Sequence, residues 1–389
     1  MLRPRSLLRE RGNYESDRVG YAELFFDLVF VFAVTQLSHA LLHNLTLGGA
    51  GQALILFMGI WWVWIFTTWC TNWLDPQRTA VRLMLFAMMA AGLILSMSIP
   101  QAFGNRGLTF AIAFAAMQIG RSLFMVRALA GKNPGNHANF IRISIWLTCS
   151  GLFWIMGGLF EDARVACWIV ALIIEYLGPA SFFRVPGFGR SNLEDWDVAG
   201  HHIAERCGLF VIIALGESIL ITGATIADME WTAGPLAAFA IALTGSIAMW
   251  WIYFNVGAER TSGKMANTDH AGGLARLAYT YIHLPIVGGI IVSAAADELS
   301  IAHPAGHLAI STALVIIVGP SLYLGGVLLF KRATGGLWHL SHLIGLALMA
   351  LSSLTISRQT PLSLAATISA ILVIVAVQET LSLREEKAS

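Results

Sequence analysis

The feature that most constrains this chain is a series of apolar runs, each long enough to cross a lipid bilayer. A membrane-spanning helix needs about 20 predominantly apolar residues. Runs of about 18–24 residues, bounded by Gly, Pro, Asn or charge, predict twelve helices, at residues 22–42, 51–72, 80–101, 107–129, 139–160, 165–184, 203–225, 234–256, 274–296, 308–330, 336–357 and 361–382. We therefore expect an all-α fold, a polytopic transmembrane helical bundle.

The composition supports the same class. Hydrophobic residues make up 57% of the 389 residues and charged residues only 12%, whereas soluble domains carry about 25% charged residues. With a net charge of +1 and no lysine-rich tract, the chain lacks the electrostatic footprint of a nucleic-acid binder. The partner that we expect is the lipid bilayer. The four cysteines have no CxxC spacing and are expected to be buried free thiols.

The distribution of positive charge predicts the orientation, because cytoplasmic loops of membrane proteins collect Lys and Arg. With the N-terminus in the cytoplasm, 21 of the 24 Lys and Arg residues fall at cytoplasmic helix ends, which leaves Arg106, Arg164 and Arg358 outside. Removing one helix from the prediction would move every later loop to the other side of the membrane, and the Lys and Arg residues would no longer fall on the cytoplasmic side. We therefore expect both termini in the cytoplasm. The N-terminal segment is polar for too long to be a removable signal peptide.

A polar segment near the middle of the chain divides the helices into two sets of six. Residues 184–202, RVPGFGRSNLEDWDVAGHH, have the Pro, Gly and acidic content of a linker. The predicted parts are a cytoplasmic N-terminal segment 1–21, a first six-helix repeat 22–184, a cytoplasmic linker 185–202, a second six-helix repeat 203–382 and a cytoplasmic tail 383–389.

Three short matches in the same order indicate that the second set of helices repeats the first. The matched pairs are Ala22-Glu23 with Ala204-Glu205, Trp61-Trp62 with Trp250-Trp251, and Arg82-Leu83 with Arg276-Leu277. Because each set holds an even number of helices, the two would be parallel repeats related by an axis along the membrane normal. Coincidence is the alternative, and interfacial anchoring could explain the Trp pairs alone.

The first apolar run carries two acids on one helical face. Glu23 and Asp27 are spaced i, i+4, which places both side chains together, and Gln36 follows in the same run. A charge near mid-membrane costs about 2.5–3.5 kcal/mol on insertion scales, so such residues face other helices or a water-filled cavity. One hypothesis is an acid that handles ions or protons. The other places Glu23 among the headgroups and pairs Asp27 structurally with an arginine or a helix N-terminus.

The start of the seventh predicted helix presents a related polar set. His201 or His202 and Glu205 share one face by their spacing. That spacing suits a metal ion, but an interfacial hydrogen-bond cluster is the interpretation that we favour. We expect no metal site.

Two further acids lie deeper in their apolar runs. Glu217 lies in IIALGESILITG and Glu175 in LIIEYLGP, each near the middle of a predicted helix. A desolvated carboxyl at this depth could cycle between its protonated and ionised forms, as a proton-coupled site requires. A permanently protonated, hydrogen-bonded Glu with a structural role is the alternative.

The ninth predicted helix holds Tyr281 and His283 just before Pro285. Proline removes a backbone donor and tends to kink a helix. A mid-membrane His that titrates near neutral pH is a candidate relay partner for the deep acids, and a neutral, hydrogen-bonded core His is the alternative. Arg121, in the fourth predicted helix, is a candidate counter-ion.

Motifs of soluble-type catalysis are absent from the sequence. There is no Walker lysine loop, GxSxG, HExxH or dinucleotide-binding GxGxxG. We therefore expect no enzyme and no cofactor, although a membrane enzyme that acts on a polar substrate at the cytoplasmic acids is not excluded.

Four segments together resemble the bacterial low temperature requirement A family. They are AELFFDLVFVFAVTQLS (22–38), WLDPQRTAVRL (73–83), ERCGLFVIIALGESIL (205–220) and YTYIHLPIVGGIIVSAAADEL (279–299). The resemblance covers roughly residues 20–385, with the segments in family order. It implies a bacterial inner-membrane protein and names no substrate.

A second, weaker resemblance concerns Phe26-Asp27, which is similar to the Phe-Ser-Asp signature of the two-repeat potassium channels of lysosomes and bacteria. Phe26 stands where that signature has Ser, and Leu209 stands where the second repeat should supply an Asp. In those channels the motif supports hydrogen bonding of the pore-lining helix. The two departures argue against a potassium-selective pore.

These observations give three function hypotheses. The first is a transporter or permease-like protein for a small solute or ion, either as a single chain or as a homo-oligomer. Its polar route would be lined by Glu23, Asp27, Gln36, Glu175, His202, Glu205, Glu217, Tyr281 and His283, with Arg121 as counter-ion. The second is a cation channel, and the third is a membrane scaffold or stress sensor whose acids only hold helices together.

Overall fold

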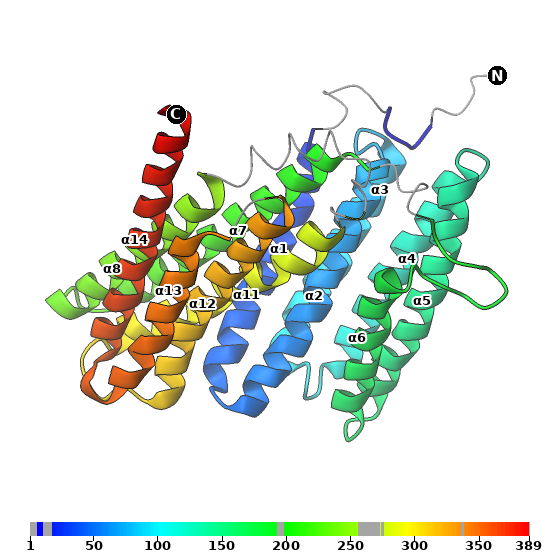
Figure 1. Ribbon diagram of the computed structural model, residues 1–389. Helices are drawn as coiled ribbons and strands as arrows, with labels where there is room; N and C mark the ends of the chain where they lie inside the picture. The colour runs from blue at the N-terminus through cyan, green and yellow to red at the C-terminus, as the bar shows by residue number, and fades with distance from the viewer. Residues whose placement is uncertain are drawn as a thin grey trace. The chain divides into compact units, whose positions relative to one another are not determined.

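The computed structural model describes residues 6–10, 18–192, 198–255, 273, 276–335 and 338–388. Within these residues the fold is all-α (Figure 1), and β pairing is limited to two isolated bridges. The helices are α1 (Tyr21–His43), α2 (Leu47–Trp73), α3 (Thr79–Ser98), α4 (Gly107–Leu129), α5 (Pro134–Leu159), α6 (Arg164–Ala180), α7 (Gly200–Ala227), α8 (Ala233–Phe254), α11 (His283–Ala302), α12 (Ile310–Ala333), α13 (Leu340–Ser352) and α14 (Pro361–Ala388). The short helices η1 (Ile99–Gln101), η3 (Arg276–Ile282) and η4 (Ser353–Arg358) extend α3, α11 and α13.

The twelve predicted helices are therefore present, and the all-α prediction is confirmed. Eleven of the helical stretches in the described chain are long and apolar enough to cross a membrane. The remaining one, α6, has 17 residues. Its predicted end at residue 184 is wrong, because Phe182 and Phe183 adopt positive φ angles of 55° and 47°, which a continuing right-handed helix excludes. The chain is a multi-pass membrane protein.

The chain separates into two compact units. The first contains the described residues up to Ala40, Ala50–Arg206 and Gly273, and the second contains Leu41–Gly49 and the other described residues after Arg206. The predicted linker 185–202 lies in the first unit, and its residues 193–197 lie outside the described residues, as do 1–5, 11–17 and 389 of the predicted terminal segments.

Helices α3, α4, α5 and α6 pack in sequence against their neighbours in the first unit (Figure 1). Glycine allows the close approach of α4 and α5, since a Cβ at Gly158 would lie 2.9 Å from the Cα of Leu108. An aromatic cluster fills the space beside this contact, with Trp154 between Phe114 and Trp168 at ring-centroid distances of 4.4 and 5.1 Å. Helix α2 is the most enclosed helix of the unit, with 83% of its apolar window buried.

Helices α11 and α12 form the tightest pair of the second unit, which also contains α8, α13 and α14. Their backbones touch at Gly289, where a Cβ would lie 2.4 Å from the backbone nitrogen of Tyr323. Before Pro285, the chain forms a π-helical stretch, η3, and such wide turns are a recognised form of helix distortion. The cysteines are free, and Cys70 and Cys207 are buried as expected. The expectation of burial is wrong for Cys149, which is exposed, and Cys167 is half-buried.

Candidate functional site

A buried ionic cluster in the first unit is the candidate site, and Glu23 is at its centre. This residue lies in the first turn of α1 and is fully buried. Its Oε2 accepts hydrogen bonds from the backbone N–H of Gly20 at 2.7 Å and from Arg9 Nη2 at 2.8 Å. Its Oε1 accepts from His202 Nε2 at 2.9 Å and from Arg206 Nη1 at 3.1 Å. Glu23 is therefore enclosed by the protein, and four donors satisfy its carboxylate.

Asp27 lies one turn further along α1 and is also fully buried. Its Oδ1 accepts from Trp64 Nε1 at 2.8 Å and from Arg206 Nη2 at 2.5 Å. Its Oδ2 is buried and receives no hydrogen bond from the described residues. Asp27 thus combines the structural arginine pair that the sequence suggested with one open acceptor atom.

Two arginines balance the two carboxylates. Arg206, from the second turn of α7, bridges Glu23 and Asp27, and its guanidinium lies 5.7 Å from the ring centroid of Trp64. Arg9 precedes α1 and is held against α2 by a hydrogen bond from its backbone N–H to the carbonyl of Trp73, at 2.8 Å. With His202 neutral, the formal charge of this set of five ionisable groups is zero.

Asn72 fixes the tautomer of His202. Its Nδ2 lies 3.3 Å from His202 Nδ1 and donates to the carbonyl of Ala199 at 2.9 Å. Because an amide N–H can only donate, His202 Nδ1 is the acceptor and Nε2 carries the proton that is donated to Glu23. The His202 imidazole therefore joins the end of α2 to the start of α1.

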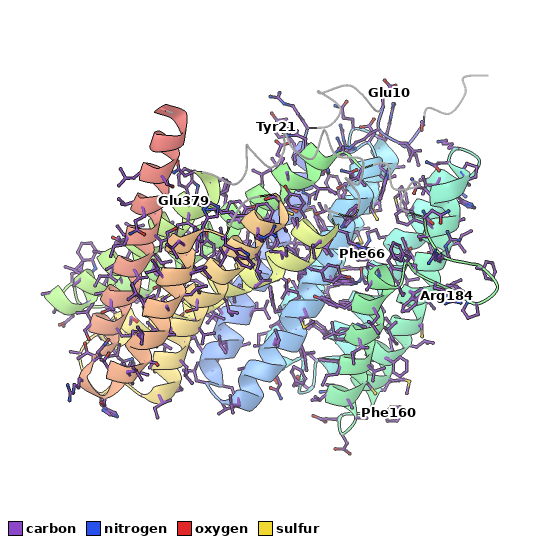
Figure 2. The ribbon with its side chains drawn as sticks, in the orientation of Figure 1. Glu10, Tyr21, Phe66, Phe160, Arg184 and Glu379 are labelled. Atoms are coloured by element: carbon purple, nitrogen blue, oxygen red, sulfur yellow. The ribbon has the colours of Figure 1, made fainter. Side chains whose placement is uncertain are left out.

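A second buried network lies on a neighbouring face of α2. Arg121 Nη1 donates to the carbonyl of Val63 at 3.0 Å and to Thr67 Oγ1 at 2.9 Å, and Nη2 donates to Gln118 Oε1. Gln118 Nε2 in turn donates to Glu175 Oε2 at 3.0 Å. The guanidinium also lies 5.6 Å from the ring centroid of Phe66, which extends from α2 (Figure 2). Arg121 therefore reaches the predicted acid Glu175 through an amide.

Glu175 is fully satisfied within the first unit. Its other oxygen, Oε1, accepts from Ser150 Oγ at 2.5 Å, so the carboxyl joins α4, α5 and α6. Helix α2 contributes Trp64 and Thr71 to the Glu23 cluster, and Val63 and Thr67 to the Arg121 network. The two groups of contacts thus lie on different faces of one helix.

The other predicted residues have different surroundings. In the second unit, His283 Nε2 lies 2.8 Å from the hydroxyl of Tyr253 and Nδ1 lies 2.8 Å from the carbonyl of Ala278. Glu217 is buried and Tyr281 half-buried in the same unit. In the first unit, Gln36 is half-buried, and Glu205 is half-buried and accepts from the N–H of Val19 at 3.2 Å.

The sequence interpretation missed several charged residues of these networks. Arg9 and Arg206 were expected at cytoplasmic helix ends with the other basic residues, yet both are buried. Lys331 and Glu379 form a buried ion pair in the second unit. For Arg206 a signal existed, since a position two turns inside an apolar helix is too deep for a loop. Among the described residues, no three His, Cys, Asp or Glu side chains are grouped as a metal site.

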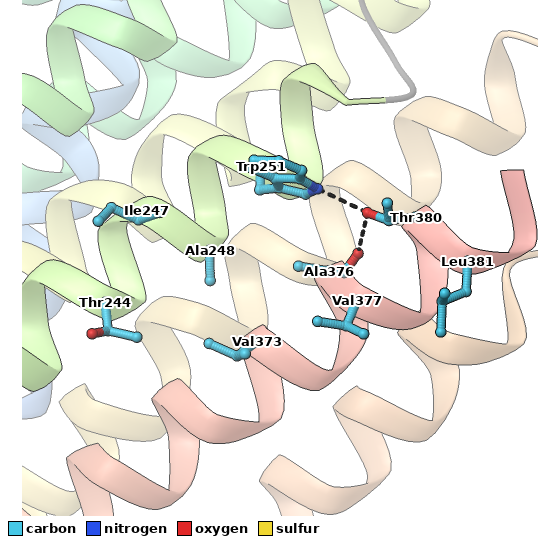
Figure 3. Close-up of a pocket in the computed structure, with 9 residues that line it drawn as sticks. All are labelled: Thr244, Ile247, Ala248, Trp251, Val373, Ala376, Val377, Thr380 and Leu381. Carbon is cyan, nitrogen blue, oxygen red and sulfur yellow. Dashed lines mark hydrogen bonds between the residues drawn. The ribbon is translucent and has the colours of Figure 1, made fainter. Parts of the chain in front are cut away.

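An apolar groove of about 430 Å³ lies between α8 and α14 in the second unit (Figure 3). Its lining consists of Thr244, Ile247, Ala248, Trp251, Val373, Ala376, Val377, Thr380 and Leu381. Trp251 Nε1 donates to Thr380 Oγ1 at 2.8 Å across it. With so few polar groups, this groove is not suited to a charged solute.

The helices and the buried ionic cluster define a polytopic α-helical membrane protein with buried charge pairs. The family model described as bacterial low temperature requirement A protein (LtrA) matches residues 18–377. The chain therefore belongs to this family, and the predicted family is confirmed. It is 41% identical over 381 residues to the Uncharacterized protein RA0937 of Rhizobium meliloti (strain 1021), covering 97% of this chain and 93% of that relative. No solved structure matches the chain.

Proposed function

We propose that this protein moves a small polar solute or ion across the bacterial inner membrane, with both termini in the cytoplasm. The observation that carries the proposal is Asp27, a fully buried carboxylate with one oxygen bound to Arg206 and Trp64 and the other without a described partner. Ionisable groups within membrane spans are expensive and mark substrate, ion or proton pathways. An open acceptor atom beside an exchangeable ion pair is what such a pathway requires.

Proton exchange at Asp27 supplies a coupling step. A proton added to the free Oδ2 neutralises the carboxylate and weakens its ion pair with Arg206, which then retains Glu23 as its acidic partner. Because Asp27 lies on α1 and Arg206 on α7, this exchange loosens a contact between the two helices. Deprotonation restores the contact and completes the cycle.

We infer that the two sets of six helices are parallel repeats, because each contains a buried cation with equivalent partners. In the first set, Arg121 on α4 donates to the carbonyl of Val63 and reaches Glu175 through Gln118. In the second set, Lys331 on α12 donates to the carbonyl of Ile252 at 3.0 Å and to Glu379 (labelled in Figure 2). Each cation joins the second, fourth and sixth helices of its set, and we call this arrangement the helix clamp.

The matched Trp pairs support the same correspondence. Val63 follows Trp61-Trp62 and Ile252 follows Trp250-Trp251, so the two carbonyls that receive the clamp cations occupy equivalent positions. The residues that follow Glu175 and Glu379 also correspond, because each contacts a tryptophan of its matched pair. Trp62 stacks on Tyr176, the residue after Glu175, with ring centroids 4.0 Å apart, and Trp251 donates to Thr380, the residue after Glu379 (Figure 3).

The proposal is tested by flux in reconstituted vesicles. Vesicles that contain a pH-sensitive dye are given a pH gradient in the presence of alkali-metal, ammonium or amino-acid salts. We expect solute-dependent proton movement, which Asp27→Asn slows by at least about tenfold, a barrier change of about 1.4 kcal/mol. Asp162→Asn, which alters an exposed acid, is the matched control and should match the unsubstituted protein.

Two results would contradict the proposal. One is flux through Asp27→Asn that equals the unsubstituted flux at every pH. The other is a passive, voltage-driven current without proton movement, which would identify a cation channel instead.

A non-transporting scaffold is the second candidate, and Glu175 favours it. Both oxygens of this carboxyl are used by Ser150 and Gln118 in contacts among α4, α5 and α6, which is a helix-joining role. The scaffold hypothesis predicts that Asp27→Asn reduces stability and that no solute in the panel moves.

A further inference from the structure

The guanidinium of Arg9 is held by acceptors arranged to fit its planar shape. Nε donates to the carbonyls of Thr71 and Leu74 at 2.8 and 3.1 Å, and Nη1 donates to the carbonyl of Arg18 at 3.0 Å. Nη2 donates to Glu23 Oε2 at 2.8 Å and lies 3.1 Å from His202 Nε2. Guanidinium has five N–H donors in a rigid fork, and the acceptors follow its three nitrogens.

Most of these acceptors belong to the membrane helices, whereas the cation does not. The carbonyl of Thr71 lies in the last turn of α2 and that of Leu74 directly follows the helix, where helix carbonyls have no helical partner and the helix dipole is negative. Glu23 belongs to the first turn of α1, and His202, whose Nε2–H donates to Glu23 Oε1, belongs to the first turn of α7. These groups form a receptacle for a cation, and Arg9 enters it from the segment that precedes α1.

A cation at this position also balances the charge of the cluster. Without Arg9, the cluster of Glu23, Asp27, His202 and Arg206 carries two carboxylates against one guanidinium, with His202 neutral. Such a net negative charge is costly where all four side chains are buried. The backbone of the Arg9 segment pairs with the end of α2 through bonds from Arg9 N–H to the Trp73 carbonyl and from Asp75 N–H to the Leu7 carbonyl, at 2.8 and 2.9 Å.

We propose that this receptacle is a binding site for a guanidinium-bearing organic cation and that Arg9 is its built-in occupant, which seals one end of the ionic cluster. The proposal rests on the proposed transport function, for which it names a substrate class. When the Arg9 segment withdraws, the same carbonyls and Glu23 receive the cation. Bound cation restores the charge balance next to the exchangeable Asp27.

Chemical rescue tests the site without relying on transport. In Arg9→Ala, purified in nanodiscs, the thermal unfolding midpoint should fall. Guanidinium chloride at low millimolar concentrations, far below denaturing levels, should restore at least half of the loss in a saturable manner. Sodium chloride and methylammonium chloride at equal ionic strength should not, because they have no planar fork of donors.

Two further variants keep the test decisive. Arg9→Ala combined with Glu23→Gln removes the carboxylate of the receptacle, so the guanidinium response should disappear. If Arg9→Ala cannot be isolated folded, Arg9→Gln, whose amide keeps two donors, takes its place in the same titration. The proposal is overturned if guanidinium gives no saturable response, or if sodium chloride gives an equal one.

Flux of guanidinium in the vesicle assay separates this proposal from the proposed function. Saturable rescue with no flux of guanidinium or of any solute in the panel would retain the site and remove the transport function. Flux of another solute that depends on Asp27, without any rescue by guanidinium, would retain transport and remove this substrate class.

Discussion

The two units use buried charge differently. The difference distinguishes charged groups that hold helices together from those that we propose to carry the activity. Both contain a helix clamp, formed by Arg121 in the first unit and Lys331 in the second. In the first, two acids one turn apart on α1 share Arg206, whereas Leu209 of α7 occupies the position that corresponds to Asp27 in the proposed repeat. A feature that both sets of helices share holds each set together. The ionic cluster around Asp27, to which α7 contributes His202 and Arg206, is not such a shared feature, so it is the better candidate for the activity.

The largest effect should come from Arg206→Met, which breaks the ionic cluster and leaves both clamps intact. Glu23 and Asp27 lose the cation that bridges them, and removing one partner of a buried ion pair costs about 3–5 kcal/mol. Reversible unfolding in mixed micelles measures the loss. Arg127→Met, which alters an exposed arginine in the last turn of α4, is the control. An equal loss in both variants would mean that the cluster contributes no special stability.

A smaller but clear effect is expected when the clamp of the second unit is broken. Lys331→Met leaves the buried Glu379 carboxylate without its cation, at a cost of about 3 kcal/mol, measured by the same unfolding. Adding Glu379→Leu should recover much of the loss, because the uncompensated charge is then gone. The neighbouring, exposed Arg332→Met should change stability by less than about 1 kcal/mol.

The corresponding change in the first unit, Arg121→Met, sharpens the comparison between the clamps. Here Glu175 keeps the donors Ser150 and Gln118, so adding Glu175→Leu should recover less than in the second unit. Equal recovery in both units would show that the Gln118 bridge contributes nothing. A large loss in one unit and none in the other would contradict the clamp as a shared feature.

Much of this architecture follows from the sequence, because a backbone within lipid must satisfy its own hydrogen bonds and helices do so. Run length and polar breaks therefore predicted the helices, and the spacing of Glu23 and Asp27 predicted their common face. Partner choice was not predictable in the same way. The rule that assigns Lys and Arg to cytoplasmic helix ends takes no account of burial, so it treated Arg9 and Arg206 like headgroup cations.

Two other features had no adequate sequence signal. Glu379 lies in the last turns of an apolar run next to a charged tail, where an acid is ordinarily solvated, and only its proximity to Lys331 on another helix makes it a buried pair. The end of α6 depends on positive φ angles at Phe182 and Phe183. Such angles are uncommon for bulky residues, so the pattern gave no reason to place them there.

The smallest expected effect tests the equivalence of Trp62 and Trp251. Trp251→Phe removes the hydrogen bond to Thr380 across the groove (Figure 3), and such interhelical bonds in membrane proteins average about 0.6 kcal/mol. Trp62→Phe should cost more, because Trp62 is fully buried and stacked on Tyr176, whereas Trp251 is 41% exposed. Unfolding of both variants, with Trp250→Phe as an exposed control, measures the difference.

If Trp251→Phe cost as much as Trp62→Phe, the exposed α8–α14 contact would contribute as much as the enclosed α2–α6 contact. The two tryptophans would then contribute equally to the free energy of unfolding. The contact between Trp251 and Thr380 would also stabilise the second unit more than the 41% exposure of Trp251 predicts.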